Sequence, residues 1–313
     1  MDNEIRVSVC VVTYNQEKYI AECLQSLVEQ KTDFRFEIIV GEDCSTDKTR
    51  GVVETFASKY PGLIVSNYHE SNVGAVANIV SSYKLAKGKY ICHMDGDDYA
   101  LPGKIQKQFE VLENNPECVI CSHDVKQVDQ EGRLIRASFR EKKEGRYGLM
   151  QLYADLPFFA HSSKMFLNDL GESYWDRLHK DALDIEVHVE QAKRGSIFHI
   201  DEVLGAYRLG VGVSSLCGKV NPSLVNGVDR IFNSALNNEL FEVGLIKRFY
   251  AKSLFSQAYQ SALFDNREDL LFFIDRSSFM CKLDIKQRAF YELSRFPVLL
   301  VALCRLRAKI RGF

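Results

Sequence analysis

The sequence predicts an α/β fold, in which a mainly parallel sheet is flanked by helices and is followed by a helical C-terminal region. Near-continuous apolar runs alternate with amphipathic helical stripes through the first half of the chain. Polar clusters follow these runs, at the positions where open parallel sheets bind ligands. Beyond about Val213 the pattern is mostly helical.

The first strand is expected over residues 7–12, because a strand covered on both faces is a continuous apolar run. Asn15 follows it and is expected to cap a helix, whose buried stripe consists of Ile20, Cys23, Leu24, Leu27 and Val28. Alternation of strands and helices predicts parallel pairing through crossovers. It continues with strands over 36–40, 63–68 and 89–94 and helices over about 48–60 and 72–86.

The later part of the chain carries weaker patterns. More strand structure is expected over 119–138, where Cys118 and Cys121 form a formal CxxC within an apolar run. We interpret this pair as part of a buried strand, because a zinc site usually needs a second ligand pair at suitable spacing. A helix is expected over 181–194, ended by Gly195.

Composition is that of a soluble globular protein, with 46% hydrophobic and 26% charged residues in 313. A net charge of -2 provides no basic field for nucleic acid. The N-terminus does not resemble a signal peptide, so we expect the nine cysteines to be reduced thiols of a cytoplasmic protein. No apolar run reaches the roughly 20 residues that span a bilayer.

The acidic cluster Asp95-Gly96-Asp97-Asp98 follows the fourth strand. Close carboxylates raise one another's pKa unless a cation lies among them. Mg²⁺ and Mn²⁺ prefer such oxygen ligands, and either ion could neutralise a diphosphate leaving group. The alternative is a solvated acidic turn.

Five motifs occur in the order seen in family-two glycosyltransferases: Thr13-Tyr14-Asn15, Glu42-Asp43-Cys44-Ser45-Thr46-Asp47, Asn72-Val73-Gly74, Ala86-Lys87-Gly88-Lys89-Tyr90-Ile91 and the acidic cluster. The chain therefore resembles this family from about Val7 to Ser215, which implies a GT-A fold. The resemblance implies a domain of residues 1–215, with a nucleotide-sugar half to about 125 and an acceptor half over 126–215, before the helical region 216–313.

The resemblance also implies roles. Tyr14 would contact the base and Asp43 would accept a hydrogen bond from uracil, while Asp97 and Asp98 would bind Mn²⁺ or Mg²⁺. The full nucleotide-sugar set is Thr13, Tyr14, Asn15, Asp43, Asn78, Asp95, Asp97 and Arg208. The alternatives are that Tyr14 packs on the sheet edge and that Asp43 caps a helix.

Two departures from the family leave the diphosphate contact open. Cys44 replaces a usual Gly or Asn, and Val76-Ala77-Asn78 stands where many members carry an Arg. Lys104 or Arg208 could supply the cation, and Arg208 could clamp a phosphate bidentately. Arg208 is equally compatible with solvated surface charge.

The catalytic base implied by the resemblance is Asp184, with Asp181 and Glu186 as rivals. Its alternative is an ordinary first-turn aspartate stabilised by the helix dipole. Glu190 departs from the family, in which an Arg is common there. His161 falls among the family's acceptor-site residues, although a lone His is more often structural.

The final segment combines apolar residues over 296–306 with Arg295, Arg305, Arg307, Lys309 and Arg311. This composition suits a helix on an anionic membrane surface, and it equally suits a helix packed on the protein.

We expect an inverting hexosyl- or N-acetylhexosaminyltransferase, using a UDP-sugar donor and a glycan or lipid-linked acceptor, in bacterial surface polysaccharide synthesis at the inner face of the membrane. Alternatives are a sugar nucleotidyltransferase, disfavoured by the absence of a Gly-rich basic loop after the first strand, and a silent binding subunit.

Overall fold

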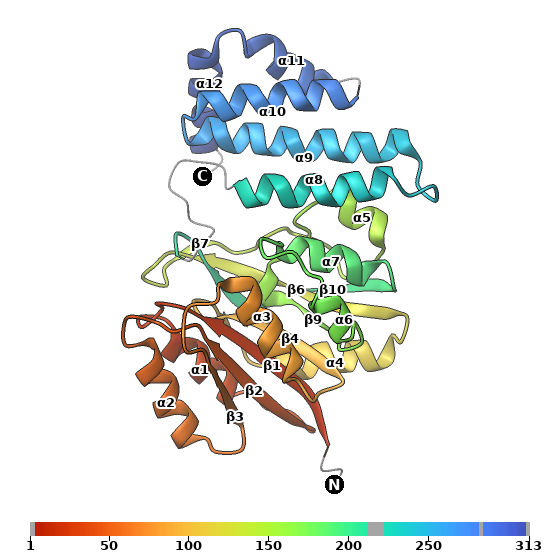
Figure 1. The fold of residues 1–313 in the computed structure, drawn as a ribbon. Coiled ribbons are helices and arrows are strands. Elements are labelled where there is room, and N and C mark those ends of the chain that lie inside the picture. Colours follow the sequence, from red (N-terminus) through yellow and green to blue (C-terminus); the bar gives the residue numbers. More distant parts are fainter. Residues whose placement is uncertain (1–3, 212–221, 282–283, 311–313) are drawn as a thin grey trace. The chain divides into compact units, whose positions relative to one another are not determined.

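The computed structural model describes residues 4–211, 222–281 and 284–310 (Figure 1). Strands and helices alternate through its first part: β1 (Ile5–Thr13), α1 (Ile20–Val28), β2 (Arg35–Glu42), α2 (Thr49–Lys59), β3 (Ile64–Tyr68), α3 (Ala75–Lys84) and β4 (Tyr90–Asp95). These elements confirm the predicted alternation, with ends displaced by a few residues.

The second part of the fold has shorter elements. They are β5 (Tyr99–Ala100), α4 (Lys104–Asn114), β6 (Cys118–Val128), β7 (Leu134–Arg136), β8 (Gly145–Tyr147), α5 (Leu149–Ala154), the 3-10 turn η1 (His161–Ser163), β9 (Met165–Leu167), α6 (Glu172–Trp175), α7 (Asp184–Ala192) and β10 (Ser196–Arg208). Cys118 and Cys121 lie buried in β6, as the apolar run predicted.

Among the described residues, one sheet has the strand order β3-β2-β1-β4-β9-β6-β10-β5, with β7 on β6 and β8 on β10. The first four strands pair in parallel, as expected. The short strand β9 is antiparallel to β4 and to β6, which makes the second half of the sheet mixed.

The two faces of the sheet follow the period of two along β1. Val7, Val9 and Val11 join the core formed with α1, α2 and α4. Between them, Ser8 and Cys10 point to the other face, where the Cys10 thiol lies 3.6 Å from the carbonyl oxygen of Ser82 in α3. Burial on both faces explains why this strand is a continuous apolar run.

Asn15 does not cap α1, which corrects the prediction from its residue type. It has a positive φ of 52°, and its side-chain oxygen accepts the backbone N–H of Thr46 at 2.8 Å. Its own N–H donates to Ser45 Oγ at 3.0 Å. Asn15 therefore joins the loop after β1 to the loop after β2, and α1 begins five residues later at Ile20.

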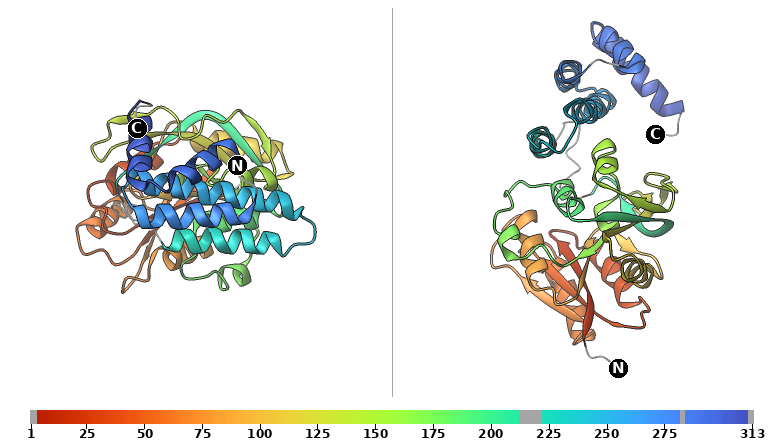
Figure 2. Two further views of the ribbon diagram at one scale, coloured as in Figure 1. Left: turned by 90° about the horizontal axis from the view of Figure 1, so that it is seen from above. Right: turned by 90° about the vertical axis from the view of Figure 1, so that its right-hand side faces the viewer.

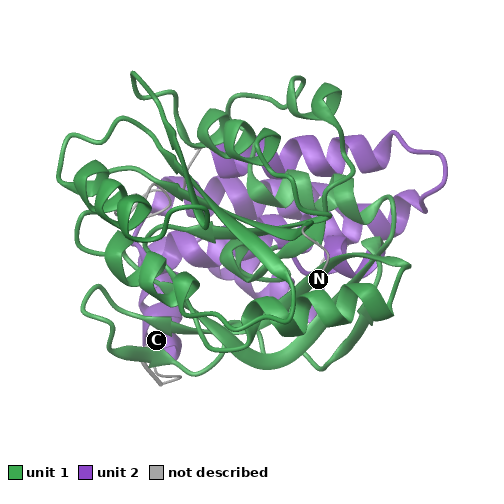
Figure 3. Cartoon of the chain, turned by 90° about the horizontal axis from the view of Figure 1, so that it is seen from below, with its two compact units in different colours: residues 1–149, 157–212 green, residues 150–156, 213–313 purple. Residues whose placement is uncertain are grey.

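The chain divides into two compact units (Figure 3). Unit 1 contains residues 1–149 and 157–212, and unit 2 contains residues 150–156 and 213–313. Unit 2 consists of most of α5 together with α8 (Pro222–Leu236), α9 (Val243–Leu263), α10 (Arg267–Met280), α11 (Ile285–Leu293) and α12 (Pro297–Ile310). The boundary expected at 215 lies outside the described residues.

Within unit 2, α8, α9 and α10 lie side by side (Figure 2). The Phe232 and Tyr250 rings stack with centroids 4.8 Å apart, and Arg276 from α10 donates to Asp229 of α8 at 3.0 Å. The ring of Tyr153 from α5 lies 5.8 Å from Phe232. Among the described helices, none combines the length and apolar character needed to cross a bilayer.

Eight cysteines fall within the described residues, and all are free. Most are buried, including Cys10, Cys92 and Cys121 in the sheet and Cys304 in α12. Burial raises the pKa of these thiols, so they are almost entirely protonated at neutral pH. Cys44 and Cys281 are partly exposed.

Candidate active site

The acidic cluster lies at the carboxyl edge of the sheet, where β4 ends beside β1. The register places Val12 opposite Asp95 and Thr13 opposite Glu42, so the segments after β1, β2 and β4 share this edge. A Cβ at Gly96 would lie 2.9 Å from Cβ of Thr13. The close approach of the two segments therefore requires glycine within the cluster.

Asp97 and Asp98 occupy surroundings that oppose their ionisation, being 8% and 2% exposed. Burial, and then the charge of Asp95, raises the pKa of Asp97 to about 7. Burial, and then the charges of Asp97 and Asp95, raises the pKa of Asp98 well above its usual value. A divalent cation held by these carboxylates would remove the repulsion that raises both pKa values.

The hydrogen bonds of Asp98 also indicate that a divalent cation binds here. Its Oδ1 accepts the backbone N–H of Arg208 at 2.8 Å. Its Oδ2 is buried and has no hydrogen-bond partner among the described residues. A buried carboxylate oxygen without a partner is costly, and a metal ion would satisfy it. The residues present thus fit the Mn²⁺ or Mg²⁺ that the sequence predicted.

Asp95 is held differently from its two neighbours. Its Oδ2 accepts the Ser162 hydroxyl at 2.9 Å, and its Oδ1 lies 3.2 Å from Nε2 of His93. Burial opposes ionisation of Asp95, but His93 and Ser162 together hold its pKa below the usual value. Asp95 is therefore an ionised carboxylate with its oxygens in use, which suits support of the cluster.

The predicted nucleotide residues gather on the same edge. Thr13 ends β1 with a buried hydroxyl that has no hydrogen-bond partner among the described residues. Tyr14 follows and is 41% exposed. The carboxylate of Asp43 accepts the backbone N–H groups of Val73 and Gly74 at 2.7 and 2.9 Å. Both oxygens of Asp43 are thus engaged by the segment that leads into α3, and the residue is 2% exposed.

Two other predicted residues are engaged inside the protein. The Asn78 amide donates to the Gly41 carbonyl at 2.9 Å, and its oxygen lies 3.2 Å from Nε2 of His69. Arg208, 4% exposed, donates to the Asp97 carbonyl at 2.9 Å and to Glu22 at 2.6 Å. Arg208 thus lies at the end of β10 and joins the acidic cluster to α1, so it is not a solvated surface charge.

Lys104, the other cation considered for the diphosphate, is fully buried. Its ammonium group donates to the carbonyl oxygen of Ser162. This bond and that of Ser162 to Asp95 fix η1 beside the acidic cluster. Neither Lys104 nor Arg208 presents a free cation to a diphosphate in this conformation, which increases the dependence on the metal.

Asp184 is the first residue of α7, and its side chain is 35% exposed. Burial raises its pKa, although Lys164 and the N–H of Ile185 oppose this. The rivals differ: Glu186 accepts the backbone N–H of Leu183 at 2.9 Å as a helix cap, and Asp181 lies in the exposed segment before α7. Asp184 combines a partly exposed carboxylate with a raised pKa, which suits a general base.

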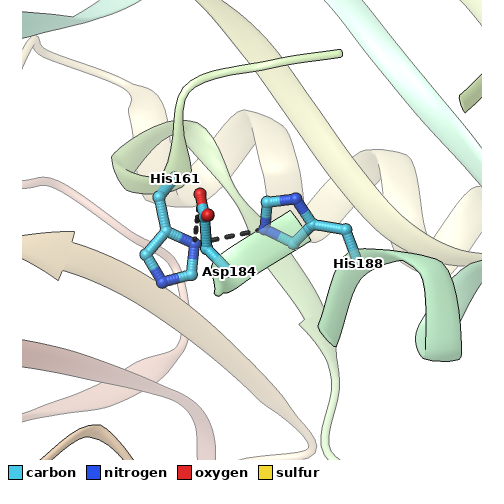
Figure 4. A group of neighbouring side chains, drawn as sticks. All are labelled: His161, Asp184 and His188. Atoms are coloured by element: carbon cyan, nitrogen blue, oxygen red, sulfur yellow. Dashed lines mark hydrogen bonds and ion pairs between the residues drawn. The ribbon is translucent and has the colours of Figure 1, made fainter. Parts of the chain in front are cut away.

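Two histidines surround Asp184 (Figure 4). Nδ1 of His161 lies 3.8 Å from a carboxylate oxygen of Asp184 and 3.1 Å from Nε2 of His188. Burial lowers the pKa of both imidazoles well below the usual value, so both are neutral at pH 7. Nearby, burial lowers the pKa of the Lys164 ammonium to about 7.

Asp184 and the acidic cluster are joined through a histidine that we did not predict. The ring of His93 lies on that of His161 with centroids 3.7 Å apart, and His93 also contacts Asp95. A signal was present, since His93 is a polar residue in a buried strand two positions before Asp95 and so on its face. His188 had a comparable signal, lying four residues after Asp184 on one helix face.

Comparisons with known proteins identify the family of the chain. The profile described as Glycosyl transferase family 2 matches residues 8–175, more than half of the chain. The uncharacterized protein Rv1520 of Mycobacterium tuberculosis is 29% identical over 210 residues, which are 64% of this chain and 58% of that relative. The match thus spans little more than half the length of this relative.

Solved structures share the fold. Residues 1–349 of Staphylococcus aureus TarS, in complex with UDP-GlcNAc, match with a TM-score of 0.67 at 21% identity over 98% of this chain and 92% of that one. The mannosyltransferase PcManGT of Pyrobaculum calidifontis, in complex with GDP-Man and Mn²⁺, matches with a TM-score of 0.58 at 14% identity over 97% and 88%. These matches confirm the expected fold.

Proposed function

Because the chain belongs to glycosyl transferase family 2, we propose that it is a metal-dependent enzyme that transfers a sugar from a UDP-sugar to a hydroxyl of a glycan or lipid-linked glycan, with inversion at the anomeric carbon. The observation that carries the proposal is the buried Asp98 carboxylate, whose Oδ2 has no hydrogen-bond partner among the described residues. Asp97 and Asp98 would hold Mn²⁺ or Mg²⁺, which supplies positive charge for the leaving diphosphate.

The chain's own residues would perform the remaining work. Tyr14 and Asp43 would hold the nucleobase of the donor, because they lie on the same edge of the sheet as the acidic cluster. Asp184 would take the proton of the acceptor hydroxyl. At the same time the hydroxyl oxygen attacks the anomeric carbon, and the bond between that carbon and the nucleoside diphosphate breaks. Its raised pKa supports this role, because proton transfer is most efficient when the base has a pKa near the working pH.

The donor and acceptor classes rest on similarity. TarS, described as a poly(ribitol-phosphate) β-N-acetylglucosaminyltransferase, is 41% identical over 98 residues, which are 30% of this chain. Its solved structure holds UDP-GlcNAc. This supports a UDP-N-acetylhexosamine as the first donor to test and a bacterial surface polymer as the acceptor class.

A panel of nucleotide sugars tests the proposal, with thermal shift and donor turnover measured with and without Mn²⁺. We expect UDP-sugars to raise the melting temperature more with Mn²⁺ than without it, because ligands that bind the native state stabilise it. Asp98→Asn should abolish Mn²⁺-dependent turnover and keep the fold, whereas Asp176→Asn, at a largely exposed carboxylate, should not. Donor binding without turnover would instead identify a silent binding subunit.

We also propose contact with the cytoplasmic face of a membrane through α12. Phe296, Leu299, Leu303 and Leu306 are 63%, 50%, 43% and 56% exposed, and their spacing places them on one side of the helix. The opposite side buries Leu300, Val301, Cys304 and Ala308 in unit 2. Exposed Arg307 suits the anionic headgroups beside such a stripe, whereas the Arg305 guanidinium donates to the Leu263 carbonyl at 3.1 Å.

A further inference from the structure

His161, Asp184 and His188 offer three metal-ligating atoms within 4.8 Å of one another (Figure 4). We propose that they form a second metal site, distinct from the acidic cluster, which takes Zn²⁺ or a similar transition-metal ion and blocks Asp184. The binding itself is independent of the proposed function. Only its consequence for transfer rests on Asp184 being the base.

The spacing of the donor atoms matches a metal centre. Tetrahedral zinc with bonds of about 2.0–2.1 Å keeps neighbouring donor atoms about 3.4 Å apart. Nδ1 of His161 lies 3.1 Å from Nε2 of His188 and 3.8 Å from a carboxylate oxygen of Asp184. Small movements of the side chains would therefore bring all three to bonding distance.

The three side chains are also held in place. Asp184 and His188 are four residues apart in α7 and so lie on one face of that helix. His161 belongs to η1, which Ser162 ties to Asp95 at 2.9 Å. The rings of His161 and His188 lie against His93 and Phe159, with centroids 3.7 and 4.5 Å apart.

The ligand types select the metal. Two imidazoles and one carboxylate suit Zn²⁺, Co²⁺ or Ni²⁺, whereas Mg²⁺ and Mn²⁺ prefer oxygen ligands. Burial keeps both imidazoles neutral at pH 7, which leaves their lone pairs available. The two sites of the chain are thus expected to prefer different ions.

The site is expected to release its ion readily. Each neutral ring bound through these atoms carries its proton on the other nitrogen, and Nε2 of His161 and Nδ1 of His188 have no hydrogen-bond partner among the described residues. Loss of such outer partners weakens metal sites by about 10–100-fold. A largely apolar pocket, lined in part by His161 and Asp184, lies beside the site.

The test is a Co²⁺ titration of the whole chain in excess Mg²⁺, which occupies the oxygen ligands of the acidic cluster. Four-coordinate Co²⁺ absorbs visible light far more strongly than six-coordinate Co²⁺. We expect strong bands that saturate at one equivalent and disappear on addition of Zn²⁺. A wild-type protein that shows only weak six-coordinate bands would overturn the proposal, whatever the variants do.

Variants locate the site. His188→Gln and His161→Gln should remove the strong bands, while Asp98→Asn should retain them. His179→Gln is the matched control, because His179 lies 3.8 Å from Asp181 in an exposed pair outside the cluster, and it should also retain them. Strong bands in a folded His188→Gln protein, checked by circular dichroism, would count against the site.

Transfer assays in saturating Mn²⁺ test whether a metal ion at the second site inhibits sugar transfer. Added Zn²⁺ should lower turnover at least about tenfold in the wild type and in His179→Gln, and should have little effect on the activity that His188→Gln retains. If Zn²⁺ removes the strong Co²⁺ absorption bands but leaves turnover unchanged, the chain has the second metal site and Asp184 is not the catalytic base. This outcome separates failure of the proposed function from failure of the metal site.

Discussion

Asp43 and Asp98 show how hydrogen bonds separate the roles of two buried aspartates. Both oxygens of Asp43 accept backbone N–H groups, so this residue is anchored and satisfied without a metal ion. Asp98 has one such bond and one oxygen without a partner among the described residues. The difference supports the proposal that Asp98 binds the cation, and it shows that Asp43 anchors the segment before α3.

Asp184→Asn should lower the turnover number by about 10²–10⁴-fold, because the amide cannot accept the acceptor's proton. Donor affinity should be unchanged, since the assigned donor contacts lie with the acidic cluster. Initial rates and a thermal shift with UDP-sugar measure the two quantities. Asp181→Asn should behave as the wild type, and the reverse pattern would move the base to Asp181.

The pKa of Asp97, about 7, predicts how Mn²⁺ affinity depends on pH. Protons compete with the ion below this value, so affinity should fall about tenfold per pH unit for each carboxylate that must ionise. Calorimetry between pH 5.5 and 8 measures this. Metal-free protein should lose stability as the pH rises through the same range, because the folded pKa lies above the unfolded one. A pH-independent affinity would contradict the assignment of Asp97.

At the residue scale, the sequence located groups that lie at strand and helix ends. Asp43 and the acidic cluster follow periodic segments, so their positions could be predicted, whereas Asp184 was implied by the family resemblance and begins α7 three residues after the predicted start of that helix. Their partners could not. Ser162 is 67 residues from Asp95, and Arg208 reaches Glu22 over 186 residues, contacts that local pattern does not encode.

At the scale of elements, Gly88→Ala tests how tightly the segment before β4 packs on β1. A Cβ there would lie 2.6–2.8 Å from backbone atoms of Val7 and Ser8, which cannot move as a side chain can. We expect a loss of about 1–3 kcal/mol in the free energy of unfolding, measured by urea denaturation with Trp175 fluorescence.

Gly51→Ala is the matched control for this change. Gly51 lies in α2, and a Cβ there would meet nothing within 4 Å. Because glycine is unfavourable in a helix, this variant should gain about 0.5–1 kcal/mol. Equal effects of the two substitutions would show that packing at Gly88 is not the cause.

Leu303→Glu should weaken binding to anionic vesicles at least tenfold, because it places a charge in the apolar stripe of α12. Binding should also weaken with added salt. Vesicle sedimentation measures both, and Leu134→Glu, at a 62% exposed position in β7, is the control. Unchanged sedimentation of Leu303→Glu would rule out this face, and concentration-dependent self-association of the wild type would identify a second copy as its partner.

Periodicity predicted the long elements better than the short ones. α1 begins and ends where its stripe does, whereas β9 has three residues and carries no period of its own. Its antiparallel position between β4 and β6 depends on contacts across the sheet. Helix α3 begins at Ala75 rather than 72 because Asp43 holds the amides of Val73 and Gly74.

At the scale of the whole molecule, α5 was not predicted, and most of it belongs with the C-terminal helices. Its Tyr153 ring contacts Phe232 and Phe241, about 80 and 90 residues away in sequence. A linear division of the chain cannot express such an insertion. The order of motifs along the sequence was sufficient for the family and fold, because both depend on the contiguous first part.

The buried thiols allow the opening of each of the two units to be measured separately in solution. Cys92 and Cys121 lie in unit 1 and Cys304 lies in unit 2, and a protonated buried thiol reacts with an alkylating reagent only when its surroundings open. In mass spectrometry after timed alkylation, Cys44 and Cys281 should be modified first, then Cys304, and last Cys92 and Cys121. Identical alkylation rates at Cys304 and Cys92 would mean that both units open in one event. The native cysteines therefore report whether the two units unfold cooperatively.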